Sequence, residues 1–277
     1  MDKSIKEIKK KTFSHMISTR RSKYFGFILA INSFRYLQPN KEKADLLEGY
    51  YILMRTIDDI VDGDLDLPQR YKSKEEFVGE KINFTLNQNA PKDNIDKLII
   101  YCFHLANRLK IDIYEETKDI LNSMLFDTKR IGKNIIFNEE QLNHHFNLLD
   151  IRGTIKGALK LFNEDPEKYL LIEPLGVASR IYYNLRDYKE DIKAGMINIS
   201  NEEFIRYKIN LEGLLIKDSN SIKKWFFEKS KTGLELITNY KTDIKIKDFG
   251  QLGKLTLKLV YELPASRYFT KIVNAQM

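Results

Sequence analysis

The stretch RTIDDIVDG, residues 55–63, is the most informative part of this sequence. It ends a segment, 44–62, in which apolar residues recur at intervals of three and four, the spacing of an amphipathic helix. On a helix, residues four apart lie on one face, so Asp58 and Asp62 form a carboxylate pair. Gly63 follows directly, and glycine is a common residue just past the end of a helix.

A second acidic stretch, NLRDYKED, residues 184–191, repeats this spacing. It lies near the end of a long helix that the pattern predicts over 169–193, closed by Gly195. Asp187 and Asp191 form the second pair. Like charges stacked on one helix face repel each other, and a hard divalent cation would relieve the repulsion. Since Mg²⁺ binds through one or two carboxylates plus substrate phosphates, two such pairs facing each other across a cavity would hold a diphosphate.

The composition favours a protein built from helices. Of its 277 residues 43% are hydrophobic, while 13 glycines and 6 prolines are few for a turn-rich all-β protein. No repeat or linker divides the chain, so we expect one domain over 1–277. The single cysteine, Cys102, excludes an intramolecular disulfide and suggests a reducing compartment. No apolar run reaches the roughly 18 residues of a membrane span, and no signal peptide is visible, so we expect a cytoplasmic protein without a transmembrane segment.

The net charge of +7 is consistent with three kinds of partner. These are a nucleic acid, an anionic membrane surface and a polyanionic small substrate. The high content of lysine, asparagine and isoleucine is equally consistent with a compositional bias of the source genome. Because the sequence has no helix-turn-helix, RRM or zinc-finger pattern, we expect no nucleic-acid partner.

Four motifs resemble those of the squalene/phytoene synthase family, the head-to-head branch of the trans-isoprenyl diphosphate synthases. Residues 55–62 resemble the family's R-x-x-D-D-x-x-D, and residues 185–195 resemble its L-R-D-x-x-E-D-x-x-x-G. Residues 153–157 loosely resemble its A-G-T-V-G segment, with one extra residue between the glycines, and residues 22–25 resemble its S-K-x-F element. The motifs occur in the family's order and cover roughly residues 22–200.

The resemblance implies an all-α, single-domain isoprenoid synthase fold with helices around a deep central cavity. The two aspartate motifs would lie on facing helices at its mouth. The activity would be head-to-head condensation of two allylic prenyl diphosphates with release of diphosphate, dependent on Mg²⁺ or Mn²⁺. An apolar product would favour peripheral association at the membrane surface. NADPH use stays open, because the reductase step of squalene synthases needs no Rossmann G-x-G-x-x-G motif, and none is visible here.

The resemblance also assigns roles to single residues. Asp58, Asp62, Asp187 and Asp191 match the catalytic positions that hold Mg²⁺ in the family. Cationic side chains of three motifs match positions that touch phosphate oxygens, and one phenylalanine matches a position that lines the pocket. The predicted substrate-binding residues are Lys23, Phe25, Arg55, Asp59, Arg186, Arg180 and Tyr183.

Two of these residues depart from the family pattern. Arg180 and Tyr183 stand where the family commonly has Gln and Asn, seven and four residues before Asp187. The segment 196–200 also lacks the usual R-x-Y-L-P. A permanent cation at position 180 would tighten the hold on diphosphate and make the cavity less hospitable to a migrating carbocation. An alternative function is therefore a diverged member that ionises one prenyl diphosphate and cyclises it or transfers it to another acceptor.

Simpler interpretations remain open for several of these residues. The aspartate pairs could be solvated surface charges, with Arg55 and Arg186 only neutralising them. Lys23 could be an ordinary surface residue and Phe25 a core residue. A non-catalytic binding or assembly protein could keep the fold, although such a relative is expected to lose the carboxylates. The adjacent residues 144–145, both histidine, point about 100° apart on a helix, so we expect no metal site there.

Overall fold

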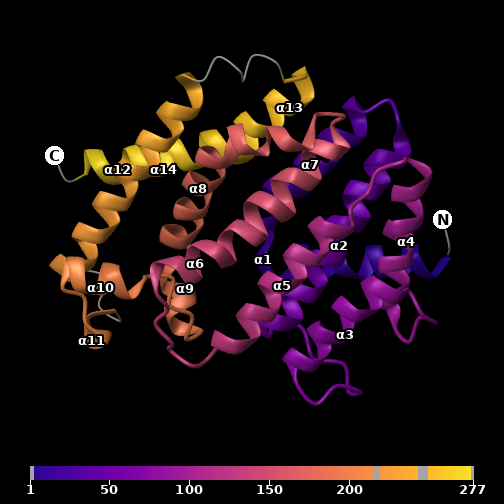
Figure 1. Ribbon diagram of the computed structural model, residues 1–277, viewed down its shortest axis with the longest axis horizontal. Coiled ribbons are helices and arrows are strands. Elements are labelled where there is room, and N and C mark those ends of the chain that lie inside the picture. The colour runs from indigo at the N-terminus through magenta and orange to yellow at the C-terminus, as the bar shows by residue number, and fades with distance from the viewer. Residues whose placement is uncertain (1–2, 215–218, 243–248, 276–277) are drawn as a thin grey trace. The chain divides into compact units, whose positions relative to one another are not determined.

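The computed structural model describes residues 3–214, 219–242 and 249–275. Within the first helix, the side chains of several residues, among them 19–27, lie outside this description. Helices, short 3₁₀ or π-helical turns and loops make up the described residues, which contain no strand (Figure 1). The all-α class predicted from the composition is therefore confirmed. None of the described helices has the length and apolar character that crossing a membrane requires.

The chain divides into two compact units, an N-terminal unit (Met1–Thr128) and a C-terminal unit (Lys129–Met277). We describe each unit by itself. The helices of the N-terminal unit are α1 (Lys3–Leu37), α2 (Lys41–Asp62), α3 (Lys74–Asn87), α4 (Asn94–Arg108) and most of α5 (Tyr114–Arg130).

Helix α2 is central to the N-terminal unit. It packs against α1, α3 and α4, and its core residues include Leu46, Leu53 and Ile57, each no more than 1% exposed. The Asn40 side chain accepts a hydrogen bond from the Glu42 backbone N–H and caps its start. The helix predicted over 44–62 is confirmed, with a start at Lys41.

The C-terminal unit consists of shorter elements arranged around α8. Two of its segments, η1 and η4, are π-helical, and η2 is a single 3₁₀ turn. In chain order the elements are α6 (Glu139–Phe146), η1 (Asn147–Ile155), α7 (Lys156–Leu161), η2 (Pro166–Lys168), α8 (Tyr169–Arg186), α9 (Tyr188–Lys193), α10 (Asn201–Tyr207), α11 (Leu211–Leu214), α12 (Asn220–Thr242), α13 (Gln251–Thr256), η4 (Leu257–Glu262) and α14 (Leu263–Asn274).

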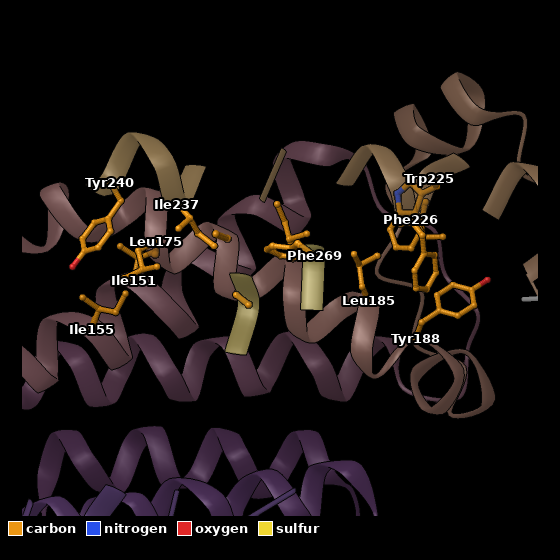
Figure 2. Close-up of a cluster of buried hydrophobic side chains, with 14 of the residues drawn as sticks. Ile151, Ile155, Leu175, Leu185, Tyr188, Trp225, Phe226, Ile237, Tyr240 and Phe269 are labelled. Carbon is orange, nitrogen blue, oxygen red and sulfur yellow. The ribbon is translucent and has the colours of Figure 1, made fainter. Parts of the chain in front are cut away.

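Helix α8 packs against α12, α14, η1 and η4, and its apolar side chains form much of the core of this unit. Figure 2 shows Leu175 of α8 beside Ile151 and Ile155 of η1, with Phe269 of α14 further along the cluster. A Cβ atom at Gly176 would lie 2.2 Å from Ile151 Cδ1, so glycine is what lets α8 and η1 approach this closely.

The long helix predicted over 169–193 is interrupted, which corrects that prediction. Helix α8 ends at Arg186 and α9 begins at Tyr188. Between them Asp187 has φ −91° and ψ 3°, away from helical values, and aspartate is a weak helix former. The Asp187 N–H still donates to Tyr183 O, and the Asp191 N–H to Asp187 O, both at 2.9 Å. The two aspartates therefore stay one turn apart despite the break.

Candidate active site

The last two turns of α2 gather three carboxylates around one guanidinium. Arg55 Nη1 lies 2.5 Å from Asp58 Oδ2, Arg55 Nε donates to Asp59 Oδ1 at 2.7 Å, and Arg55 Nη2 lies 3.8 Å from Asp62 Oδ2. The Asp59 side chain is only 2% exposed, whereas Asp58 and Asp62 are 28% and 27% exposed. Asp58 and Asp62 are thus the accessible pair that the four-residue spacing predicted, and Asp59 is a buried partner of Arg55.

The end of α2 adds further negative character to this pair. Gly63 has φ +89°, and the backbone N–H groups of Gly63, Asp64 and Leu65 all donate to Asp59 O. A helix C-terminus carries partial negative charge, which opposes nearby carboxylates. Burial, followed by the neighbouring Asp58 carboxylate, raises the pKa of Asp62 to about 8, although Arg55 partly opposes this. Because one arginine faces three aspartates, this turn carries a net negative charge that a bound cation would neutralise.

In the second motif, the two aspartates bind different partners. Arg186 forms a two-pronged ion pair with Asp187, Nε to Oδ1 at 2.8 Å and Nη2 to Oδ2 at 2.6 Å. Asp191 Oδ2 instead accepts a hydrogen bond from Asn198 Nδ2 at 2.8 Å. The Arg186 guanidinium also lies over the Tyr183 ring, 4.7 Å from its centroid.

Asn198 is held in place by a buried cation. Its Oδ1 accepts a hydrogen bond from Arg130 Nη1 at 2.7 Å, and Arg130 Nη2 lies 3.5 Å from His145 Nε2. Arg130 and His145 are 4% and 2% exposed. Because a guanidinium only donates, the amide oxygen of Asn198 must face Arg130, which leaves its NH₂ group to Asp191. The sequence pointed to none of these three residues, and the only signal was that Asn198 lies where the R-x-Y-L-P pattern fails.

The glycine at the end of the second motif is explained by its surroundings. Gly195 has φ +71°, and a Cβ atom there would lie 2.7 Å from Gly132 Cα. The Gly132 N–H donates to Ala194 O at 2.9 Å, and the Asn134 N–H donates to Gly195 O at 3.1 Å. This backbone contact ties the end of α9 to the loop after α5.

Arg180 has a carboxylate partner that the sequence did not predict. It forms a two-pronged ion pair with Asp150 of η1, Nε to Oδ2 at 2.6 Å and Nη2 to Oδ1 at 2.7 Å. Asp150 thus pairs with the cation that the sequence places at position 180, and the effect of that cation on diphosphate and on a carbocation stays a prediction. The shared face of Arg180 and Tyr183 is confirmed, since the guanidinium lies 5.8 Å from the Tyr183 ring centroid. Tyr183 is thus flanked by two guanidiniums, each held by its own carboxylate.

Arg180 and Asp150 also line a cavity of about 380 Å³ within the C-terminal unit. Its wall combines apolar side chains such as Phe146 and Ile181 with many polar groups. Asn184 and Asn198 belong to the same wall, so the cavity extends from the middle of α8 to the neighbourhood of the second motif.

Two predicted residues and one predicted arrangement stay untested. Lys23 and Phe25 lie in α1, but their side chains are outside the part of the chain that the structure describes. The first motif belongs to the N-terminal unit and the second to the C-terminal unit. Their facing arrangement across a central cavity therefore stays a prediction.

The donor set fits a magnesium ion better than a transition metal. Each pair offers carboxylate oxygens only, and Mg²⁺ usually takes one or two carboxylates and completes its shell with water and phosphate oxygens. Among the described residues no three His, Cys, Asp or Glu side chains gather as a metal site would require. Burial and the Asp58 carboxylate raise the pKa of Asp62, and a cation bound at this pair would lower it again.

Comparison with known proteins gives a fold and no closer assignment. No family model matches the sequence, and no curated protein does. The crystal structure of squalene synthase HpnC from Alicyclobacillus acidocaldarius is similar, with a TM-score of 0.72 and 11% identity, covering 99% of this chain and 96% of that one. A dehydrosqualene synthase in complex with ligand has a TM-score of 0.65 and 18% identity, covering 98% of this chain and 88% of that one. The chain therefore has the all-α fold of squalene and dehydrosqualene synthases, as its four motifs predicted.

Proposed function

We propose that this protein is a Mg²⁺-dependent prenyltransferase that joins two allylic prenyl diphosphates head-to-head and releases diphosphate. The observation that carries the proposal is the pair of carboxylate motifs. In the first pair Arg55 lies within ion-pair distance of both Asp58 and Asp62, and in the second Arg186 lies within that distance of Asp187. The fold shared with a squalene synthase over nearly the whole chain supports the same activity class.

Each group in the motifs has a chemical task in this proposal. The carboxylate pairs would hold Mg²⁺ or Mn²⁺, which supplies neutralisation of the leaving diphosphate. Arg55 and Arg186 present planar guanidiniums that suit phosphate oxygens, and they would share their hydrogen bonds between carboxylate and phosphate. Lys23 would add a third cation, and Phe25 an apolar wall near the reacting carbons.

A second candidate function is ionisation of one prenyl diphosphate, followed by cyclisation or by transfer to a different acceptor. The specific observation in its favour is the wall around Arg180. An ion pair with Asp150 stands where the family commonly has glutamine, and it borders a cavity with many polar groups. Such a wall suits a polar acceptor better than a second hydrocarbon chain.

The deciding experiment is incubation with Mg²⁺ and C10, C15 or C20 prenyl diphosphate, with and without NADPH, followed by mass analysis of the organic extract. A hydrocarbon of twice the chain length supports head-to-head condensation, and its dependence on NADPH decides the reductase step. A cyclised or conjugated product of single chain length supports the second candidate. Failure to consume any of the three diphosphates contradicts both.

A further inference from the structure

The cavity beside α8 has a wall unlike that of a hydrocarbon pocket. It is formed by α6, η1, α8, α12 and the segment 198–203, all in the C-terminal unit. More than half of its lining residues are polar, including four asparagines. The charged residues of the wall are Glu139, Asp150, Glu173, Arg180, Glu203 and Lys229.

The charges of this wall do not balance. Each of its two cations forms an ion pair within the wall, Arg180 with Asp150 and Lys229 with Glu203. Glu139 and Glu173 have no side-chain ion pair among the described residues. The wall therefore carries two uncompensated carboxylates at neutral pH, which disfavours an anionic ligand such as a diphosphate and favours a cation.

Two buried polar groups on residues of the same wall also lack a partner within the described chain. Trp225 is 1% exposed and its Nε1 has no acceptor, while Asn184 Oδ1 has no donor. Unpaired buried groups of this kind are uncommon in native proteins. Of the two, only the Asn184 oxygen could accept a hydrogen bond from an ammonium group, whereas the Trp225 N–H needs an acceptor that such a group does not supply. The wall also contains Phe146 and Trp225 as aromatic surfaces, which favour a cation.

We infer that this cavity binds a small organic cation, an alkylammonium with a short hydrocarbon body. The ammonium group faces the carboxylates of Glu139 and Glu173, and the hydrocarbon body lies along the apolar part of the wall. A volume of about 380 Å³ is within the usual range for small-molecule sites. None of the four motif aspartates lines this cavity, although it reaches the neighbourhood of the second motif, and the inference about its occupant requires no prenyl transfer.

The site borders the second motif through a short series of contacts. Arg180 of its wall lies over Tyr183, Tyr183 lies under Arg186, and Arg186 holds Asp187. A bound cation would therefore lie within a few contacts of a residue proposed to bind metal.

The test uses the only tryptophan of the sequence, Trp225, as a reporter inside the cavity wall. Hexylammonium, hexanol and hexanoate are titrated into the full-length protein while tryptophan fluorescence is recorded. These probes share one hydrocarbon chain and differ in charge. We expect hexylammonium to bind at least about tenfold more tightly than hexanol, because its hydrogen bonds to carboxylates are charge-assisted, and hexanoate to give no saturable change. Equal binding of hexanoate, or no saturable change with hexylammonium, would overturn the inference.

Matched variants locate the response. Glu173→Gln and Glu139→Gln should each weaken hexylammonium binding several-fold, whereas Glu235→Gln removes the same charge from the exposed surface of α12 and should leave binding unchanged. Circular dichroism checks that each variant folds; if Glu173→Gln does not, the exposed Glu139 decides. Unchanged affinity in the folded variants contradicts the site. Because no turnover is measured, the result is independent of whether prenyl transfer is found.

Discussion

The two carboxylate motifs hold their carboxylates in different ways. In the first, a single side chain, Arg55, contacts Asp58, Asp59 and Asp62, and all four residues belong to α2. In the second, the partner of Asp191 is Asn198, which lies beyond the end of α9. These contacts of the first motif lie within one helix, whereas the contact of Asp191 in the second depends on tertiary structure.

This difference separates two kinds of sensitivity. Arg55 forms an ion pair with the buried carboxylate of Asp59. Substitution of Arg55 should therefore lower the stability of the fold as well as change the site. Asn198 orients one accessible carboxylate, so changes there should act mainly on metal affinity. The following predictions test that division, from the largest expected effect to the smallest.

The largest effect is expected from the four accessible carboxylates. Asp58→Ala, Asp62→Ala, Asp187→Ala and Asp191→Ala should each lower kcat at least about a thousandfold, because the leaving diphosphate loses charge neutralisation. Steady-state turnover with whichever of the C10, C15 and C20 diphosphates the wild type consumes measures this, and circular dichroism should show an intact helical fold. Asp66→Ala, which removes an exposed carboxylate just beyond α2, is the control. Near-normal rates in any two of the four variants would contradict the site.

The second prediction compares the two arginines. Arg55→Met leaves the Asp59 carboxylate, 2% exposed, without its partner and should lower the free energy of unfolding by about 3–5 kcal/mol. Arg186→Met should cost less than half as much, because Asp187 is 19% exposed and can be hydrated. Urea denaturation measures both. Adding Asp59→Leu to Arg55→Met should recover most of the loss, and equal losses in the two single variants would refute the distinction.

The third prediction concerns the partner of Asp191. Asn198→Ala should weaken binding of Mg²⁺ with inorganic diphosphate by about 10- to 100-fold, as loss of an orienting hydrogen bond usually does. Calorimetric titration measures this without any turnover. Asn239→Ala, on the exposed surface of α12, should leave the affinity unchanged. An unaltered affinity in Asn198→Ala would mean that Asp191 needs no such orientation.

The most gradual effect should be a pH dependence from the first motif. The pKa of Asp62 is about 8 in the folded protein, above its value in the unfolded chain, so protonated Asp62 favours folding at low pH. That contribution is lost as the pH rises from about 4 to about 8. The free energy of unfolding of metal-free protein should therefore fall less steeply over this range in Asp62→Asn than in wild type. Parallel pH profiles for the two proteins would contradict the raised pKa.

Local patterns predicted the N-terminal half of the site well. The spacing of Asp58 and Asp62, the helix that carries them and its end at Gly63 all depend on interactions within a few residues. Helical periodicity and glycine punctuation report such interactions directly. The interruption at Asp187 escaped the same reasoning, because hydrophobic periodicity continues through it.

The parts that escaped prediction depend on residues distant in sequence. Asp150, which neutralises Arg180, is 30 residues away, and Arg130, which fixes Asn198, is 68 residues away. Nothing in the motif around Arg180 indicates a nearby carboxylate on η1. The ion pair of Arg180 depends on the packing of the π-helical segment η1 against α8, which local sequence patterns do not report.

The contact between Gly132 and Gly195 has a kinetic consequence. A helix such as α2 can form within about a microsecond, and its arginine then meets its carboxylates at once. The surroundings of Asp191 require closure of a much longer loop, which is slower. Native-state openings that separate the backbone at Gly132 from that at Gly195 would free Asn198 and Asp191 while α8 stays folded. The second half of the site would then assemble later than the first and fluctuate more often.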